Sequence, residues 1–202
     1  ISGSYQGEEQ MIPLGSYATV EDTPLLNPNA GLTITMWIKP TTPDKGVQTL
    51  IAKGEGYEFF LGQNGDLSFR LQHNEGEVVC TGIPLRKEWY FVAATYDVVS
   101  GIITITQQPV RPSPNDPSAS TISQEITGQL VKNTQPLTIA ASLGDSDETS
   151  SHFNGRIDRP RIFNQAMSAS QLDGLARGAD PLDYIDILIG AWDFSLDINS
   201  DG

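Results

Sequence analysis

The chain has 202 residues, of which 38% are hydrophobic, and this is enough for one domain with a sizeable core. Its formal net charge of −13 argues against nucleic acid as a partner, because phosphates bind Lys and Arg, and against an anionic membrane surface. No apolar run approaches the length of a membrane span. The single cysteine, Cys80, has no partner for a disulfide within the chain, which favours a cytoplasmic location, and its β-branched neighbours predict a buried thiol.

Alternating apolar residues predict strands along the first half of the chain. In "LTITMWIKP", Leu32, Ile34, Met36 and Ile38 alternate with polar residues and Trp37, as in a half-buried strand. "YEFFLGQNGDLSFRLQ" predicts a hairpin, because two strand-like runs flank an Asn-Gly pair typical of a type I′ turn. These two segments therefore indicate a β-rich fold.

Two further strands are predicted before a long loop. "EWYFVAATYD" (88–97) is rich in aromatic and β-branched residues, as a central strand is, and "GIITITQQ" follows after a short turn and is expected to pair with it. Four prolines between residues 109 and 117 prevent a regular ladder. The stretch 107–116 is therefore expected to be an exposed loop.

The last third of the chain adds strands and a helix. "LTIAASLG" (137–144) and "HFNGRIDRPRIFN" (152–164) predict strands, with Pro160 marking a bulge or an edge and Ile162 on the face opposite Ile157. Ser168 and Gln171 form a capping box for one helix that ends at Gly178. "DILIGAWDFS" predicts the last strand. About a dozen short strands with one late helix indicate an antiparallel sandwich of two sheets.

The chain ends on "DINSDG", which matches the first half of a calcium loop. The loop would also need a bidentate acid at its twelfth position and flanking helices, whereas this motif follows a predicted strand. We therefore expect one domain over residues 1–196 and the start of a linker over 197–202. The first residues carry neither Met nor a signal peptide pattern, so the chain is expected to be a piece of a longer protein.

The order of these segments resembles the laminin-G-like, or concanavalin-A-like, jelly roll. The resemblance rests on "GLTITMWIKP", "EWYFVAATYD" and "FNGRIDRPRIFNQAMSASQL", and it covers nearly the whole chain. It implies core packing for Trp37 and Trp89, and Trp192 is likewise predicted to be core.

"GSYATVED", "LARG" and "GAWDFS" further resemble the corresponding domain in large subunits of N,N-dimethylformamidase and related proteins. That family consists of amide hydrolases with a mononuclear iron site and a second, small subunit. The resemblance places the iron ligands and catalytic residues after this domain. The resemblance therefore implies that this chain contains no catalytic residue and no cofactor. It also implies that the partner of this domain is the catalytic domain or the small subunit.

The carboxylates and histidines are the residues from which a catalytic site within the chain would have to be built. A glycan hydrolase needs two carboxylates across one bond, whereas Glu58, Glu88, Asp97 and Asp158 are scattered singly, as turn or edge residues are. His73 and His152 lack the spacing of zinc ligands, and no nucleophile or phosphate-binding motif occurs. No catalytic site is predicted.

The loop "GDSDETSSHFNG" carries Asp145, Asp147 and Glu148, which are weak candidates for calcium ligands at a sandwich rim. Two functions stay open. A non-catalytic interaction domain predicts a contiguous apolar patch. A carbohydrate-binding module, with or without calcium, predicts an exposed aromatic side chain beside this acidic loop.

Overall fold

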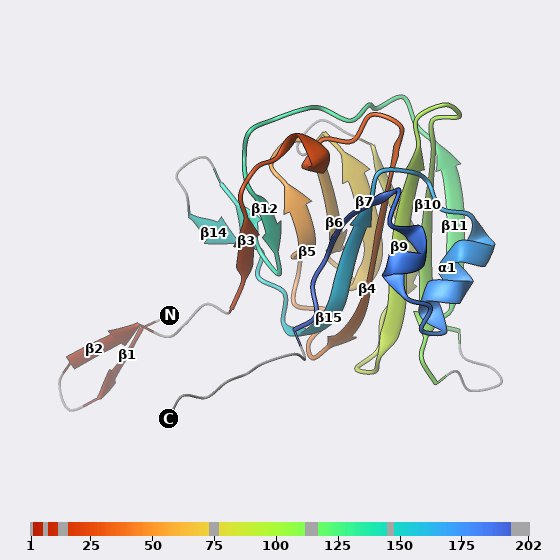
Figure 1. Ribbon diagram of the computed structural model, residues 1–202. Coiled ribbons are helices and arrows are strands. Elements are labelled where there is room, and N and C mark those ends of the chain that lie inside the picture. The colour runs from red at the N-terminus through yellow and green to blue at the C-terminus, as the bar shows by residue number, and fades with distance from the viewer. Residues whose placement is uncertain are drawn as a thin grey trace.

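The computed structural model describes residues 2–5, 8–11, 16–72, 77–111, 117–144 and 148–194, with side chains from residue 16 onward. Two six-stranded antiparallel sheets face each other (Figure 1), which confirms the predicted jelly-roll sandwich. Within the described residues, no helix is long and apolar enough to cross a membrane.

Sheet I has the spatial order β11-β10-β9-β4-β15-β16. Its strands, in that order, are Ser120–Glu125, Ile102–Pro109, Tyr90–Asp97, Gly31–Pro40, Gly155–Phe163 and Leu188–Ala191. Sheet II has the order β3-β12-β5-β6-β7-β8. Its strands are Ala18–Val20, Leu137–Ile139, Gln48–Lys53, Tyr57–Leu61, Asp66–Leu71 and Val78–Pro84. The predicted strand over 88–97 is β9, which lies between β10 and β4 as a central strand.

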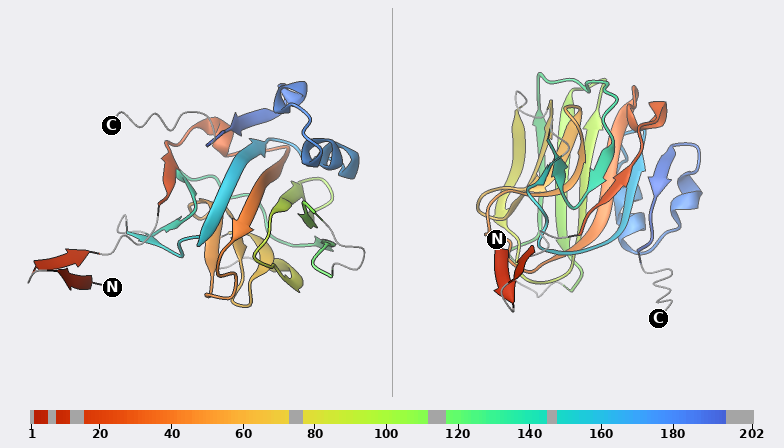
Figure 2. Two further views of the ribbon diagram at one scale, coloured as in Figure 1. Left: turned by 90° about the horizontal axis from the view of Figure 1, so that it is seen from below. Right: turned by 90° about the vertical axis from the view of Figure 1, so that its left-hand side faces the viewer.

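Short elements complete the described chain. Two small hairpins pair β1 (Ser2–Tyr5) with β2 (Glu8–Met11) and β13 (Ser142–Leu143) with β14 (Thr149–Ser150). The helix α1 (Ala169–Ala176) and the 3-10 turns η1 (Pro24–Leu26) and η2 (Pro181–Tyr184) are the helical segments. Figure 2 shows that the C-terminal segment with α1 and η2 lies on the outer side of sheet I.

The alternation in β4 places its apolar residues between the sheets. Leu32, Ile34, Met36 and Ile38 are fully buried in the main core. The opposite face was expected to be exposed, but Thr33 and Thr35 are also fully buried. The reason is a second core, in which α1 and η2 cover the outer face of sheet I through the residues Phe91, Ala93, Phe163, Met167, Leu172, Leu175 and Tyr184.

Several local predictions need correction. The hairpin of β6 and β7 is present, but its turn is closed by the Gly65 N–H on the Gly62 carbonyl, with Gly65 at φ 80°. Asn64 does not have positive φ, so this is a type I turn followed by a left-handed glycine rather than a type I′ turn. The predicted loop over 107–116 begins later, because β10 extends to Pro109 and Gln107 is buried.

The bulge predicted at Pro160 is confirmed by a register shift between Asp158 and Arg161 against β4. It also changes which face the following residues occupy. The extra residue returns Ile162 to the main core, on the same side as Ile157, which corrects the expectation of opposite faces. Arg161 and Phe163 consequently point to the outer face of sheet I.

The tryptophans and the cysteine are more exposed than predicted. Trp37, Trp89 and Trp192 are each only half-buried. Cys80 is exposed, because it lies on the outer face of β8 while its neighbour Val79 fills the core. Partial desolvation of its sulfur, together with the nearby Asp66, still raises the pKa of the Cys80 thiol, which disfavours a reactive thiolate.

Candidate functional site

The outer face of sheet II carries one buried carboxylate, Glu58 on β6. Arg70 lies directly opposite it on β7 and donates from Nε at 2.9 Å and from Nη2 at 2.5 Å, while Thr49 Oγ1 donates to the other carboxylate oxygen at 2.7 Å. The Arg70 guanidinium also lies 4.9 Å from the centre of the Phe60 ring. Glu58 is only 1% exposed, so the prediction of a turn or edge residue was wrong.

This arrangement is unsuited to hydrolysis of a glycosidic bond. Asp66 also lies on β7, four residues before Arg70, which is the register partner of Glu58. About 13 Å of strand therefore separates Asp66 from the level of Glu58, far beyond the ~5 Å between the two carboxylates of a retaining glycosidase. Glu58 is held by an ion pair and a hydroxyl, so its charge is already compensated. Glu88 accepts a hydrogen bond from the Tyr90 hydroxyl at 3.1 Å, and Asp97 accepts one from the Val99 N–H in the β9–β10 turn. The outer face of sheet II therefore holds a structural ion pair.

Hydrogen bonds from Val99 and Ser100 lower the pKa of Asp97, as expected for a carboxylate that caps a turn. Asp158, the remaining candidate carboxylate, lies in β15, and its Oδ2 atom is 3.9 Å from Arg159 Nε. The structure does not bring these four carboxylates together.

The acidic loop lies partly outside the described residues. Asp145 and Asp147 lie outside the described residues, as do His73 and the half-motif at 197–202. Glu148 is exposed, and its carbonyl accepts the Gly144 N–H at 2.9 Å. Within the described part of the chain, no group of three or more His, Cys, Asp or Glu side chains is placed to hold a metal ion. Calcium binding by Asp145, Asp147 and Glu148 stays a prediction.

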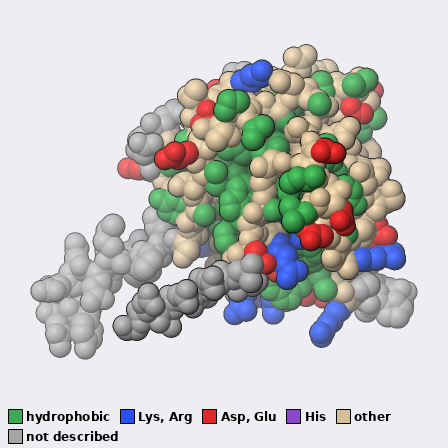
Figure 3. Space-filling model, viewed as in Figure 1, with side chains coloured by type: hydrophobic (Ala, Val, Ile, Leu, Met, Phe, Trp, Pro, Cys, Tyr) green, Lys and Arg blue, Asp and Glu red, His purple; other side chains and the backbone are tan. Residues whose placement is uncertain are grey.

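A groove of about 450 Å³ opens along one side of the sandwich, where β3 of sheet II approaches β15 of sheet I. We call it the edge groove. It is lined by the side chains of Tyr17, Ile139, Phe153, Ile157 and Phe194, with Asn154 and Ser16 as polar members. Tyr17 is 48% exposed and Phe194 is 43% exposed. Figure 3 shows hydrophobic side chains on the face of the molecule that includes this side.

The edge groove adjoins the acidic loop through Tyr17. The Tyr17 ring packs edge-on against the His152 ring with centroids 5.9 Å apart, and His152 Nε2 lies 3.1 Å from Thr149 Oγ1 in β14, so both partners belong to the second half of this loop. The sequence alone does not reveal this pair of aromatic rings, because Tyr17 and Phe194 are 177 positions apart and only the folded sandwich brings them together. The groove thus combines an apolar lining with an exposed aromatic ring beside the acidic loop.

The profile of the Concanavalin A-like lectin/glucanases superfamily matches residues 14–173, and the chain belongs to this family. Two curated relatives are similar over almost the whole chain. The N,N-dimethylformamidase beta subunit of Paracoccus aminophilus is 27% identical over 99% of this chain, and that of an Alcaligenes species is 24% identical over 100%. The chain spans only 29% of the length of each relative.

Solved structures with the same fold are lectin-like. A putative carbohydrate binding protein from Bacteroides ovatus superposes with a TM-score of 0.65 and 19% identity, covering 89% of this chain and 49% of that one. The CBM40 domain of the Ruminococcus gnavus IT-sialidase, solved with α2,3-sialyllactose, gives a TM-score of 0.60 and 12% identity, covering 80% of this chain and 97% of that one. At these identities the likeness establishes the fold.

Proposed function

We propose that this chain is a non-catalytic interaction domain of a larger amide hydrolase of the dimethylformamidase type, and that it packs against the catalytic domain or a partner subunit. The observation that carries the proposal is the edge groove, whose apolar lining includes two exposed aromatic rings. It meets the expectation of an apolar patch for a docking domain. The relatives support it, since their named subunits extend far beyond the segment that matches this chain.

The position of the groove fits this role. Ser16 and Tyr17 begin the continuous sandwich, and Phe194 is the last described residue, so both ends of the body border the groove. A neighbouring domain of the same polypeptide would therefore have the exposed rings of Tyr17 and Phe194 within reach, and burial of apolar surface there would stabilise the contact.

Hydrogen–deuterium exchange tests this docking. We expect slower exchange at residues 16–20 and 190–194 in a complete dimethylformamidase-type subunit that contains this domain than in the 202-residue chain. The β9–β10 turn is the internal control, because Val99 there is 94% exposed and lies away from the groove. Equal exchange at the groove in the complete subunit and in the isolated chain would refute the docking role.

A second candidate function is carbohydrate binding at the same groove. It is favoured by Tyr17, an exposed aromatic ring beside the acidic loop, because sugar rings stack on such faces. Screening the 202-residue chain against a glycan array, with Tyr17→Ala as the matched variant, separates the two functions. Binding that Tyr17→Ala abolishes supports the lectin role, and an unchanged array with protected groove segments in the complete subunit supports docking.

A further inference from the structure

Arg161 is a buried cation that forms no ion pair with a described carboxylate. It is 6% exposed, and its Nη1 atom is buried without a hydrogen-bond partner among the described residues. Its guanidinium group packs over the Trp37 indole, with the guanidinium carbon 5.3 Å from the ring centroid. Buried guanidinium groups are normally paired, because an uncompensated charge in an apolar environment is costly.

The side chain directly beside Arg161, that of Thr35, also has a polar atom without a hydrogen-bond partner among the described residues. Thr35 in β4 is the register partner of Arg161 in β15, so both side chains lie on the outer face of sheet I. Thr35 is fully buried, and its Oγ1 has no hydrogen-bond partner within the described chain. Its neighbour Thr33, two residues earlier on the same face, has its hydroxyl fully used by the Gln165 carbonyl at 2.6 Å and the Met167 N–H at 2.9 Å. The two unpaired polar atoms therefore mark one polar spot within the second core.

The acidic residues around Arg161 disfavour a multiply charged anion at this position, because they repel negative charge. Burial and the nearby Arg159 lower the pKa of Arg161, whereas Asp180, Asp158 and Asp193 act in the opposite direction. None of these carboxylates forms an ion pair with Arg161 among the described residues, and Asp158 and Asp193 lie 3.9 Å and 3.7 Å from Arg159 instead. One buried guanidinium surrounded by three outlying acids matches a monoanion better than a dianion.

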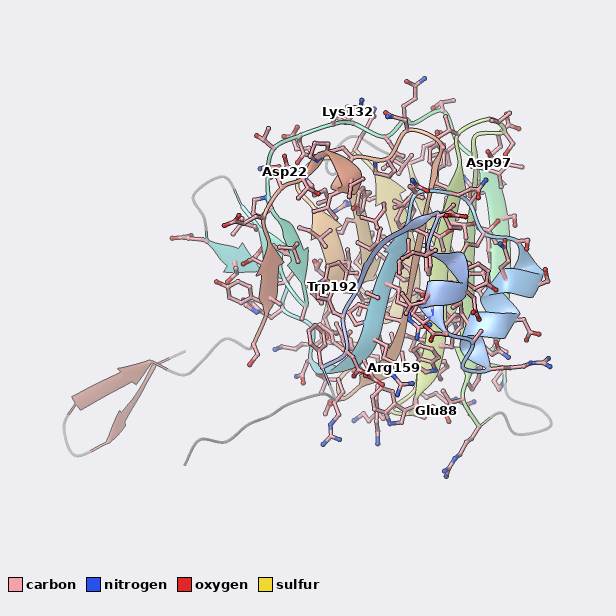
Figure 4. All side chains as sticks on the ribbon, viewed as in Figure 1. Asp22, Glu88, Asp97, Lys132, Arg159 and Trp192 are labelled. Atoms are coloured by element: carbon pink, nitrogen blue, oxygen red, sulfur yellow. The ribbon has the colours of Figure 1, made fainter. Side chains whose placement is uncertain are left out.

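Arg159 provides an approach to this spot. Its guanidinium carbon lies 6.0 Å from the same Trp37 ring, and its side chain, labelled in Figure 4, is 46% exposed. The guanidinium groups of Arg159 and Arg161 thus both lie near the half-buried Trp37 indole, and that of Arg159 is exposed whereas that of Arg161 is buried. Because exposed cations draw anions towards a site, Arg159 is placed to guide an anion to Arg161.

We propose that Arg161, Thr35 and Arg159 form a binding site for a small monoanionic carboxylate on the outer face of sheet I. The planar guanidinium fork of Arg161 donates two parallel hydrogen bonds to the carboxylate oxygens. The Thr35 hydroxyl donates a third hydrogen bond. Occupancy satisfies both atoms that are otherwise buried without partners. The site is distinct from the edge groove and does not depend on the docking role of the domain.

Thermal unfolding of the 202-residue chain in sodium acetate tests the site, with sodium chloride at equal ionic strength as the control. We expect acetate to raise the melting temperature, since binding to the folded state lowers the unfolding constant about 100-fold at 100 times the dissociation constant. With all salts at pH 8, where phosphate is largely the dianion, sodium phosphate is expected to have a weaker effect than acetate. Identical melting in acetate and chloride, or a response to phosphate alone, would overturn the proposal.

Two variants tie the effect to the site. Arg161→Met keeps an unbranched apolar side chain in place of the aliphatic stem and removes the buried charge, so it is expected to fold without acetate and to lose the acetate response. Thr35→Val replaces the unpaired hydroxyl by a methyl group of similar size, which leaves the fold intact and weakens the response. Arg177→Met, at a side chain that is 79% exposed, is the control that retains it. An acetate response that survives in both Arg161→Met and Thr35→Val contradicts the assignment.

Discussion

Lys53 carries a positive charge into the interior at the end of β5. Its side chain is fully buried, and its Nζ atom lies 2.9 Å from Asp22 Oδ1 and 3.0 Å from Asn133 Oδ1. The carbonyl oxygens of Asn133 and Gln135 complete the cage at 3.1 and 2.5 Å. Asp22 belongs to the segment before η1, and Figure 4 shows it near Lys132, which neighbours Asn133. Lys53 therefore holds the segments around Asp22 and Asn133, which are far apart in sequence, against sheet II.

Replacing Lys53 by Met is expected to lower the free energy of unfolding by about 3–5 kcal/mol, the usual loss when one partner of a buried pair is removed. The reason is that Asp22 and the two carbonyl oxygens are left without their cation. Urea denaturation measures this loss. Lys132→Met, at an exposed side chain in the same region, is the control and is expected to change little. A loss below about 1 kcal/mol for Lys53→Met would show that the cage contributes little.

Burial of the Tyr57 hydroxyl is expected to make the folded state less stable as the pH rises into the alkaline range. Burial raises the pKa of Tyr57 well above its ordinary value of 10.0, and its hydroxyl donates to the Leu26 carbonyl at 3.3 Å. A raised folded pKa contributes stability that is present below the unfolded pKa and is lost as pH rises above it. Burial also raises the pKa values of Tyr90 and Tyr96, so these residues act in the same direction.

We therefore expect the urea midpoint of the chain to fall between about pH 9 and about pH 11, and Tyr57→Phe to reduce that fall. The comparison is made within each variant, because Tyr57→Phe also removes the bond to Leu26. Tyr17→Phe changes an exposed ring and is expected to retain the full pH dependence. An equally steep fall in Tyr57→Phe would assign the alkaline sensitivity to other groups.

At the scale of elements, helix α1 holds the second core in place. The Ser168 hydroxyl accepts the Gln171 N–H, and Gln171 Oε1 accepts the Ser168 N–H at 2.8 Å, which completes the predicted capping box. Leu172 and Leu175 then pack on the outer face of sheet I. Because this short helix has no other recorded cap at its start, its stability depends on this pair.

Ser168→Ala is expected to destabilise the protein by about 0.5–2 kcal/mol, because the first turn loses its acceptor. Chemical denaturation followed by far-ultraviolet circular dichroism measures the change. Ser168→Asp restores an acceptor oxygen and adds a negative charge at the helix start, so it is expected to recover most of the stability. Equal loss in both variants would mean that the serine acts through packing.

The same elements show what the sequence can and cannot predict. Strand alternation, the capping box and the Pro160 bulge depend on neighbours along the chain, and all three are confirmed. The burial of Thr33 and Thr35 was missed because a helix more than 130 residues away covers them. Glu58 was taken as an edge residue because its partner Arg70 becomes visible only once β6 and β7 are in register. The edge groove likewise depends on contacts between distant segments.

At the scale of the whole molecule, charge is unevenly distributed. The formal net charge is −13, yet basic residues gather at one end of the sandwich, where β4 ends and β15 begins, and Figure 3 shows blue side chains at its lower end. Lys39 and Arg156 lie directly opposite each other there on β4 and β15, and both are exposed. Directly opposed like charges in a sheet destabilise it, so this pair opposes the fold locally.

Arg156→Glu separates the local effect of charge from the global one. The substitution changes the net charge from −13 to −15, which increases overall repulsion, but it places a carboxylate opposite Lys39. We expect a gain of about 0.2–1 kcal/mol in the free energy of unfolding, because neighbouring side chains interact more strongly than charges beyond a screening length of about 10 Å. Arg111→Glu makes the same change of charge at an exposed position outside the strands and is expected to give no gain. Equal effects of Arg156→Glu and Arg111→Glu in urea denaturation would show that net charge, rather than cross-strand pairing, controls stability at this end.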